Sequence, residues 1–475
     1  MMGPVPALDE RATACARRLH EADRVLLASH IDADGLTSAA IASTALERAS
    51  LPHEVVFKKQ LDETEIASIA ATEYETVLFT DFGSGQLDDI AEHERAGDFE
   101  PVIADHHQPA DETTEYHLNP LLEGIDGASE LSGAGASYLL ARALAETDDG
   151  SVPANNRDLA ALAVVGAVGD MQTVEGELTG ANEAIVAEGA EAGVIEEATD
   201  LTLYGTQTRP LPKLLEYGND VRIPGISNDE QGAVAFLQDL DVDLQVEGSW
   251  RRWVDLTAEE KQTVTSALLQ RALERGVPSE KAQRLVGTAY RLLDEPEGSE
   301  LRDASEFSTL LNATARYERA DVGLAVCLGD RTEALDRARR LLENHRRNLS
   351  EGLETVSQQG VEEAEHVQYF DAGEEIRETI VGIVAGMALG IDGVNPDRPI
   401  IAFARKNDEE TKVSARGTGR LVARGLDLSA VMTTASRAVG GDGGGHDIAA
   451  GATVPAGAEE AFVEEADALV GEQLG

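Results

Sequence analysis

The chain has 475 residues, of which 42% are hydrophobic, so it is long enough for two or three domains with separate cores and is not intrinsically disordered. Its 88 acidic and 39 basic residues give a formal net charge of −49. Such an acidic excess with little lysine is typical of a surface adapted to high cytoplasmic salt, where ions screen the repulsion between carboxylates.

The two cysteines, Cys15 and Cys327, lie in unrelated contexts, which excludes a disulfide framework and agrees with a reducing cytosol. Residues 1–11 lack the apolar core of a signal peptide, and the most apolar stretch, residues 380–391, is too short and too rich in glycine to cross a bilayer. We therefore expect a cytoplasmic protein with no membrane partner.

The first 200 residues alternate short apolar runs with helical patterns. Strands are predicted over residues 24–29, 54–57, 76–80 and 101–104, a helix over 35–48 and a buried helix over 159–168. This alternation predicts an α/β fold with a mostly parallel sheet.

The remainder of the chain changes character twice. Residues 181–210 and, more strongly, 255–348 have helical patterns, and the second stretch contains an arginine-dense segment. The α/β pattern then resumes, with helices predicted over 376–389 and 428–438, strands over 400–404, 411–415 and 448–454, and a loop over 440–445. We expect three domains: residues 1–205, a largely helical insert over 206–350, and a second α/β domain over 351–475.

Polar clusters follow the apolar runs of the first domain. They are His30-Ile31-Asp32-Ala33-Asp34-Gly35, then Asp81, then Asp105-His106-His107, and finally Gly169-Asp170. Ligands bind beyond the carboxyl ends of strands in parallel sheets, so the clusters are expected to meet. On an extended segment His30, Asp32 and Asp34 would point to one side, and Gly35 would permit a tight turn into the next helix. Taken alone, the first cluster could be a polar turn that caps a helix, Asp81 could belong to a simple turn and Asp105-His106-His107 to an exposed loop, and Asp170 is ambiguous.

Taken together, the clusters supply imidazoles and carboxylates but no thiolate. This set suits two Mn²⁺ ions, with Mg²⁺ as an alternative, and argues against structural zinc. Two such ions can stabilise an in-line displacement at phosphorus. No GxSxG motif or Walker A sequence offers a competing chemistry.

A second candidate site lies near the C-terminus, in Gly443, Gly444, Gly445 and His446. Consecutive glycines let backbone N–H groups approach an anion, so the segment can cradle phosphate, although a flexible hairpin loop is the alternative. Between residues 397 and 437, eight basic residues stand against five acidic ones, an unusual balance in this chain that favours phosphate contacts. Tyr369, Phe370 and Phe403 could stack on bases or belong to the core.

These motifs resemble those of the DHH-family phosphoesterases, whose name describes the triplet Asp105-His106-His107. The Gly443–His446 segment with Ala449-Ala450-Gly451 is similar to the associated DHHA1 domain, and the helical insert with residues 301–303 and 307–313 resembles the archaeal RecJ-like single-strand exonucleases of the GINS-associated type.

The resemblance implies a role for each position. One metal ion would be held by His30, Asp32 and Asp81, and a second by Asp34, Asp81, His106 and Asp170. His107 would contact the scissile phosphate or the leaving group, Asp105 would orient the histidines, and Arg416 with Gly443–His446 would hold substrate phosphates.

We therefore expect a two-metal exonuclease that releases 5′-mononucleotides from single-stranded nucleic acid, with DNA preferred over RNA, in replication or repair. One alternative is a phosphoesterase for small substrates such as nanoRNA, a cyclic dinucleotide or a nucleoside bisphosphate. Another is a replisome scaffold bound to a GINS-type complex, in which nuclease activity is secondary.

Overall fold

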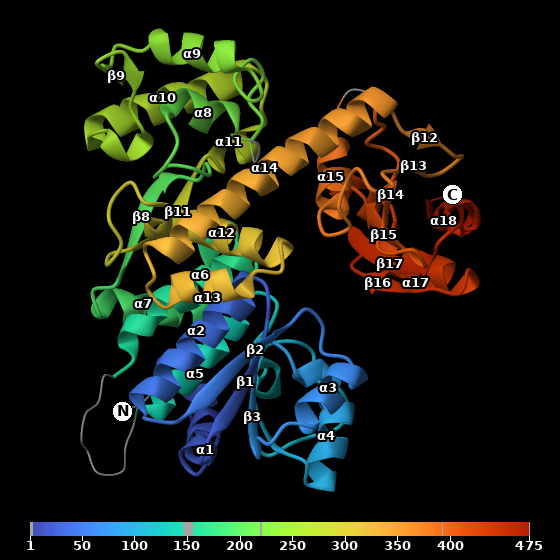
Figure 1. Cartoon of the computed structure of the whole chain (residues 1–475). Coiled ribbons are helices and arrows are strands. Elements are labelled where there is room, and N and C mark those ends of the chain that lie inside the picture. Colours follow the sequence, from blue (N-terminus) through green and yellow to red (C-terminus); the bar gives the residue numbers. More distant parts are fainter. Residues whose placement is uncertain (1–2, 146–154, 219–220, 392, 475) are drawn as a thin grey trace. The chain divides into compact units, whose positions relative to one another are not determined.

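A computed structural model describes residues 3–145, 155–218, 221–391 and 393–474 (Figure 1). It divides the chain into two compact units, Met1–Arg339 and Arg340–Gly475. The α/β class predicted from the sequence is confirmed.

The first unit is built on a five-stranded parallel sheet with the order β2-β1-β3-β4-β5. The strands are β1 (Val25–His30), β2 (His53–Lys58), β3 (Thr76–Thr80), β4 (Glu100–Ala104) and β5 (His117–Leu118). The four longer strands confirm the predicted ones to within a residue or two. β1, β3 and β4 end next to His30, Asp81 and Asp105, so the sheet brings these residues to one edge.

Helices cover both faces of this sheet (Figure 1). On one face α3 (Glu63–Ala70) and α4 (Leu87–Ala96) bury Ile66, Ile69, Leu87 and Ile90 against Phe79 and its neighbours in the strands. On the other face lie α1 (Asp9–His20), α2 (Ala33–Arg48) and α5 (Gly133–Leu144), and α6 (Ala160–Gly169) packs on α2 and α5. The helices α2, α5 and α6 carry small residues where they meet, which brings their backbones close together.

The rest of the first unit extends from an antiparallel ribbon of β8 (Ile195–Leu201) and β11 (Val286–Leu292). Beyond the ribbon, a separate core around Trp253 and Phe236 joins the helices between these two strands. The helices of this part are α7 (Ala181–Glu191), α8 (Leu211–Glu216), α9 (Glu230–Gln238), α10 (Ala258–Glu274), α11 (Ser279–Gln283), α12 (Ala304–Arg316) and α13 (Ala320–Cys327), and the short strands are β6 (Thr173–Val174), β7 (Glu177–Leu178), β9 (Gln245–Val246) and β10 (Ser249–Trp250). The helix predicted over 181–210 is thus wrong beyond Glu191, because residues 195–201 form β8. The helical stretch predicted over 255–348 is likewise interrupted by β11. The sequence did not indicate these strands because each forms its backbone hydrogen bonds with the other across a long intervening segment.

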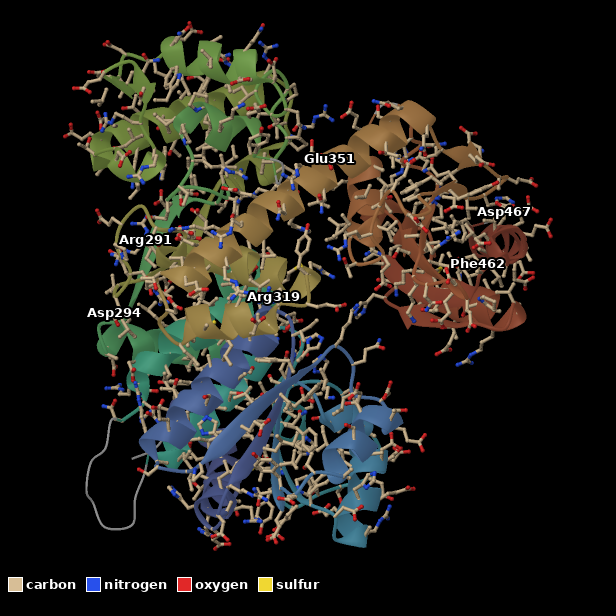
Figure 2. The ribbon with its side chains drawn as sticks, viewed as in Figure 1. Arg291, Asp294, Arg319, Glu351, Phe462 and Asp467 are labelled. Carbon is tan, nitrogen blue, oxygen red and sulfur yellow. The ribbon has the colours of Figure 1, made fainter. Side chains whose placement is uncertain are left out.

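The second unit contains a six-stranded sheet with the order β12-β13-β14-β15-β17-β16. The helix α14 (Glu333–Gln359) begins in the first unit and continues into the second. The further elements of the second unit are β12 (Glu362–Glu363), β13 (Gln368–Asp371), α15 (Val381–Ala388), β14 (Ile400–Arg405), β15 (Glu410–Arg416), α16 (Gly419–Val422), α17 (Leu428–Ala438), β16 (Asp442–Gly445), β17 (Ala449–Pro455) and α18 (Glu459–Leu474). Two side chains of α18, Phe462 and Asp467, are labelled in Figure 2. Phe403 packs edge-on against Phe462, and Asp467 accepts hydrogen bonds from the backbone N–H groups of His366 and Val367. Phe370 and Phe403 are core residues, so the suggestion that they stack on bases is wrong.

The loop predicted over 440–445 is wrong as well, because residues 442–445 form the edge strand β16, paired with β17. Gly443 suits this strand because both β17 and α17 lie close to it. A Cβ on Gly443 would lie 2.7 Å from Ala452 Cβ and 3.0 Å from the Met432 carbonyl oxygen. Part of the glycine content of this segment is therefore explained by packing.

No helix within the described residues is long and apolar enough to cross a membrane.

Candidate metal centre

The predicted ligands of the first unit come together at the carboxyl edge of its sheet. Their ligand atoms form three overlapping groups within the described residues: His30 with Asp32 and Asp81; Asp34 with His106 and Asp170; and Asp81 with Asp105, His106 and His107. Asp81 and His106 each belong to two groups. Two of the three groups contain only residues that the family resemblance assigns to the two ions, and the assignment of ligands to ions stays a prediction.

The first motif, residues 30–35, is not extended throughout, as we had expected, but turns into a helix. It does not continue as an extended segment, because Asp32 is the N-cap of α2 and Asp34 already lies in the first turn of that helix. Asp32 therefore points to His30, with 3.1 Å between Asp32 Oδ2 and His30 Nδ1, whereas Asp34 joins His106 and Asp170. Gly35 does not make a left-handed turn. It is required because a Cβ there would lie 2.2 Å from the carbonyl oxygen of His30.

Asp34 is held by the N-terminus of α5. Its Oδ2 accepts a hydrogen bond of 2.7 Å from Gly133 N, and its Oδ1 accepts one of 3.0 Å from Ala134 N. Gly133 must lack a side chain, since its Cβ would lie 2.5 Å from Asp81 Oδ1. Nothing in our sequence analysis pointed to these residues, although the Ser132-Gly133-Ala134-Gly135 segment, with Ser132 as N-cap of α5, is a recognisable helix start.

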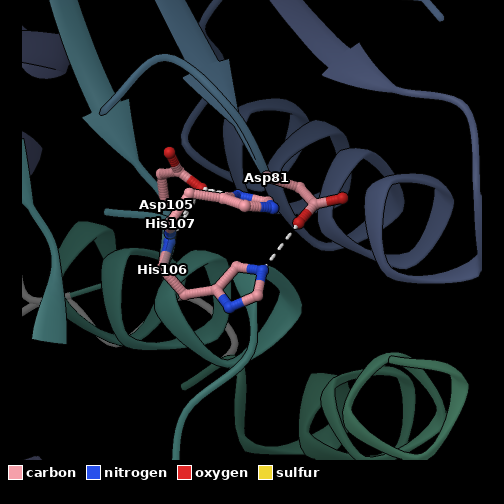
Figure 3. A group of neighbouring side chains, drawn as sticks. All are labelled: Asp81, Asp105, His106 and His107. Atoms are coloured by element: carbon pink, nitrogen blue, oxygen red, sulfur yellow. Dashed lines mark hydrogen bonds and ion pairs between the residues drawn. The ribbon is translucent and has the colours of Figure 1, made fainter. Parts of the chain in front are cut away.

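In the Asp105-His106-His107 segment (Figure 3), Asp105 and His106 are buried, whereas His107 is exposed. Asp105 is fully buried and accepts hydrogen bonds from His106 N, His107 Nδ1 and the backbone N–H of Ser84. Despite burial, the hydrogen bond from His107 lowers the pKa of Asp105 to about 2. Asp105 thus stays ionised and orients the imidazole of His107, whereas it binds His106 through the backbone N–H alone. Its role in orienting both histidines stays a prediction.

His106 presents one nitrogen to the carboxylates. Its Nδ1 donates to the carbonyl oxygen of Gly127 at 2.7 Å. Its Nε2 is buried and has no hydrogen-bond partner among the described residues, yet faces Asp81 Oδ1 at 3.3 Å (Figure 3). It also lies 3.8 Å from both Asp34 Oδ2 and Asp170 Oδ2. A buried imidazole nitrogen surrounded by carboxylate oxygens is the environment of a metal ligand, because a cation satisfies all of these groups at once.

The electrostatics of the centre also fit divalent cations. Burial and the neighbouring carboxylates of Asp81 and Asp170 raise the pKa of Asp34, and burial raises the pKa of Asp170 to about 6. Hydrogen bonds to Asp32 and Asp81 outweigh burial and raise the pKa of His30 to about 11. The cluster therefore takes up positive charge, which two divalent ions would provide for the four carboxylates of Asp32, Asp34, Asp81 and Asp170.

Two further residues support the centre without having been predicted as site residues, although Asn312 lies in the segment 307–313 that resembles the RecJ-like exonucleases. Asn312 of α12 accepts a hydrogen bond of 3.1 Å from Ala33 N, between the two aspartates of the first motif. Asn119, which is fully buried, donates to the carbonyl oxygen of His107 and to Ser84 Oγ. Both contacts join residues far apart in the sequence, so no local pattern could reveal them.

The remaining predicted site residues lie in the second unit. Arg416, at the end of β15, is half-buried, and its Nη1 donates to the carbonyl oxygen of Ala415. Its side chain lies along α15, because a Cβ on Gly382 would be 2.5 Å from Arg416 Nη2. Gly443, Gly444 and Gly445 form β16, and His446 follows with an exposed side chain.

Comparison with known proteins shows which family the chain belongs to. Three family models match it: the DHH family, N-terminal domain over residues 24–167, the DHH-CID domain over 203–286 and the DHHA1 domain over 365–472. An uncharacterized protein of Methanocaldococcus jannaschii is 30% identical over 455 residues, which cover 94% of this chain and 93% of that protein.

Solved structures share the fold. RecJ of Thermus thermophilus in complex with Mn²⁺ matches with a TM-score of 0.61 and 19% identity, over 99% of this chain but only 56% of the RecJ chain. A second structure, of exonuclease RecJ bound to manganese, has a TM-score of 0.61 and 19% identity over 99% and 96% of the two chains. CDC45 of Entamoeba histolytica has a TM-score of 0.66 and 12% identity, over 98% and 99%.

The match to the DHH family and the acidic, histidine-containing centre at the edge of the sheet together support a metal-dependent hydrolase. Its domain order and its full-length relative identify it further: the chain belongs to the DHH family and is RecJ-like in fold. The finer resemblance to the GINS-associated type stays a prediction.

Proposed function

We propose that this protein is an exonuclease that uses two Mn²⁺ ions, or Mg²⁺ in their place, to hydrolyse single-stranded nucleic acid, preferably DNA, to 5′-mononucleotides. The observation that carries the proposal is the buried His106 Nε2, which has no hydrogen-bond partner in the described part of the chain and faces the carboxylates of Asp34, Asp81 and Asp170. Similarity to RecJ structures that contain manganese supports the choice of metal.

The chain supplies the groups that such a reaction needs. When bound, two divalent cations neutralise charge on the scissile phosphate and lower the pKa of the attacking water. His107 is exposed at the edge of the centre, and its Nδ1 is committed to Asp105 at 2.8 Å. That hydrogen bond raises the pKa of His107, so its Nε2 can hold a proton for the phosphate or the leaving oxygen. In the second unit, Arg416 and the segment Gly443–His446 would bind phosphates of the substrate strand.

The test is digestion of matched DNA and RNA single strands, each labelled at either end, by the protein in high KCl with Mn²⁺. We expect release of mononucleotides, with DNA preferred, and no release after chelation with EDTA. Asp81→Ala should abolish activity because Asp81 contacts both His30 and His106. A wild-type protein that binds Mn²⁺ but releases no nucleotide would refute the proposal, and cleavage confined to dinucleotides would favour the small-substrate alternative.

The likeness to CDC45 supports a second candidate, a role in a replication complex with a GINS-type partner. This candidate predicts stable co-purification with replication proteins that persists in Asp81→Ala. Loss of the nuclease activity without loss of that association would separate the two roles.

A further inference from the structure

Gln172 lies behind the group formed by Asp34, His106 and Asp170 without being one of its ligands. Its side-chain Nε2 donates to Asp170 Oδ2 at 2.9 Å and to the carbonyl oxygen of Gly127 at 2.9 Å. The same carbonyl accepts the hydrogen bond from His106 Nδ1. One amide group thus contacts one predicted ligand directly and shares an acceptor with another.

The backbone brings Gln172 to this position through the end of α6. Asp170 is the C-cap, and Met171 adopts a left-handed conformation with φ of 58°. The N–H of Met171 donates to Val168 O and that of Gln172 to Ala167 O, a pattern that ends many helices. The turn directs Met171 outward, 86% exposed, and Gln172 inward, 1% exposed.

Asn182, in the first turn of α7, fixes the orientation of the Gln172 amide. Its Nδ2 donates to Gln172 Oε1 at 2.7 Å, and its own backbone N–H donates to Glu130 O. Asn182 is buried as well. Because Oε1 of Gln172 receives this hydrogen bond, the Nε2 group must point to Asp170.

We propose that Gln172 and Asn182 are positioning residues that together set the geometry of Asp170 and His106 for the divalent cation these two ligands share. This inference rests on the proposed function, since it assumes that the centre binds two cations. Partners that orient metal ligands typically contribute about 10–100-fold in metal affinity. Among the predicted ligands, Gln172 contacts those of only one of the two ion sites. Loss of its hydrogen bonds should therefore lower the affinity for one cation and leave the affinity for the other unchanged.

The experiment is calorimetric titration of the full metal-free chain with Mn²⁺. Gln172→Met keeps the approximate length of the side chain and removes its hydrogen bonds. We expect this variant to bind one of two Mn²⁺ ions with an affinity about 10–100-fold lower, and to bind the other with unchanged affinity. Asn182→Asp keeps the volume of the side chain, but its carboxylate accepts a hydrogen bond where the Asn182 amide donated one. The Gln172 amide should therefore turn its oxygen towards Asp170, which lowers the affinity for the same Mn²⁺ ion.

Two comparisons make the test specific. The double variant should bind Mn²⁺ no more weakly than Gln172→Met alone, because both changes act through one amide. Met171→Gly should bind as the wild type does, since glycine adopts the left-handed conformation readily and the lost side chain is exposed.

The outcomes separate this inference from the proposed function. Two Mn²⁺ ions bound by the wild type, with unchanged affinities in folded Gln172→Met and Asn182→Asp, would overturn the positioning role and leave the proposed function standing. A wild-type protein that binds no Mn²⁺ would overturn the proposed function itself. Thermal unfolding of each metal-free variant establishes that it is folded, and if Gln172→Met is not, the isosteric Asn182→Asp decides.

Discussion

Replacement of Gly166 by alanine should disrupt the candidate metal centre from the helix behind it. Gly166 lies in α6, where a Cβ would be 2.4 Å from Asp34 Oδ1, 2.4 Å from Ala134 Cβ and 2.5 Å from Thr37 Oγ1. None of these atoms ends a long, flexible side chain, so the new methyl group must displace either Asp34 or the helices that surround it.

The magnitude follows from three contributions. Overpacking a filled interior costs about 1–3 kcal/mol. Displacement of Asp34 removes at least one of its hydrogen bonds from Gly133 N and Ala134 N, each worth about 1.5–3 kcal/mol to a charged acceptor. Alanine recovers about 1 kcal/mol of helix propensity. The free energy of unfolding should therefore fall by about 1.5–5 kcal/mol, and Mn²⁺ affinity should fall with it.

Scanning calorimetry and Mn²⁺ titration of the full chain measure both effects. The matched control is Gly386→Ala in α15, where the nearest atom to the new Cβ, Arg416 Cγ, is 3.7 Å away and the helix should gain about 0.5–1 kcal/mol. If Gly166→Ala unfolds at the wild-type temperature and binds Mn²⁺ with wild-type affinity, the account of how Asp34 is held is wrong.

Three further predictions concern other parts of the chain. Asn312→Ala should leave a buried backbone N–H in the first motif without its acceptor, cost about 1–3 kcal/mol and weaken Mn²⁺ binding; unchanged unfolding and titration curves would contradict this. Burial raises the pKa of Glu306 from 4.5 to about 7, so the folded chain holds this proton more tightly than the unfolded chain. The protonated Glu306 carboxyl therefore contributes stability that is present below pH 4.5 and is lost as the pH rises to about 7. Glu306→Gln should abolish this loss of stability. If the urea-unfolding midpoints of variant and wild type change in parallel from about pH 5 to 8, Glu306 is not the cause. Gly382→Ala should displace the guanidinium of Arg416 and raise KM for single strands with kcat unchanged; a loss of kcat alone would exclude a role in substrate binding.

The sequence revealed those parts of the fold that depend on local pattern. The strands that end at His30, Asp81 and Asp105 are short apolar runs between polar loops, and each was predicted with nearly correct bounds. The glycine-rich composition of residues 442–445 wrongly indicated a loop, because the segment pairs with β17, and Gly443 has no room for a side chain between β17 and α17. Composition also misled us at β8, an acidic strand whose partner β11 is remote in the sequence.

The same distinction applies to the centre. Its histidines and aspartates stand out because ionisable residues directly after buried segments are unusual. Gly133 and Gly166 do not stand out, because each is defined by a contact with an element elsewhere in the chain. Asn312 lies in the segment 307–313 that resembles the RecJ-like exonucleases, but its contact with Ala33 could not be read from that segment. Their importance follows from the convergence of α5, α6 and α12 on α2, which no local spacing indicates.

The two aspartates of the first motif each serve the fold as well as the centre. Asp32 caps α2 through Gly35 N, and Asp34 holds the first residues of α5. A descendant of this chain that lost hydrolysis would still gain stability from both side chains, so their survival in a sequence is poor evidence of activity. Within the described residues, the side chains of His30 and Asp81 pair with ligand residues alone, which makes these two the positions to inspect when active and inactive copies of this architecture have to be told apart.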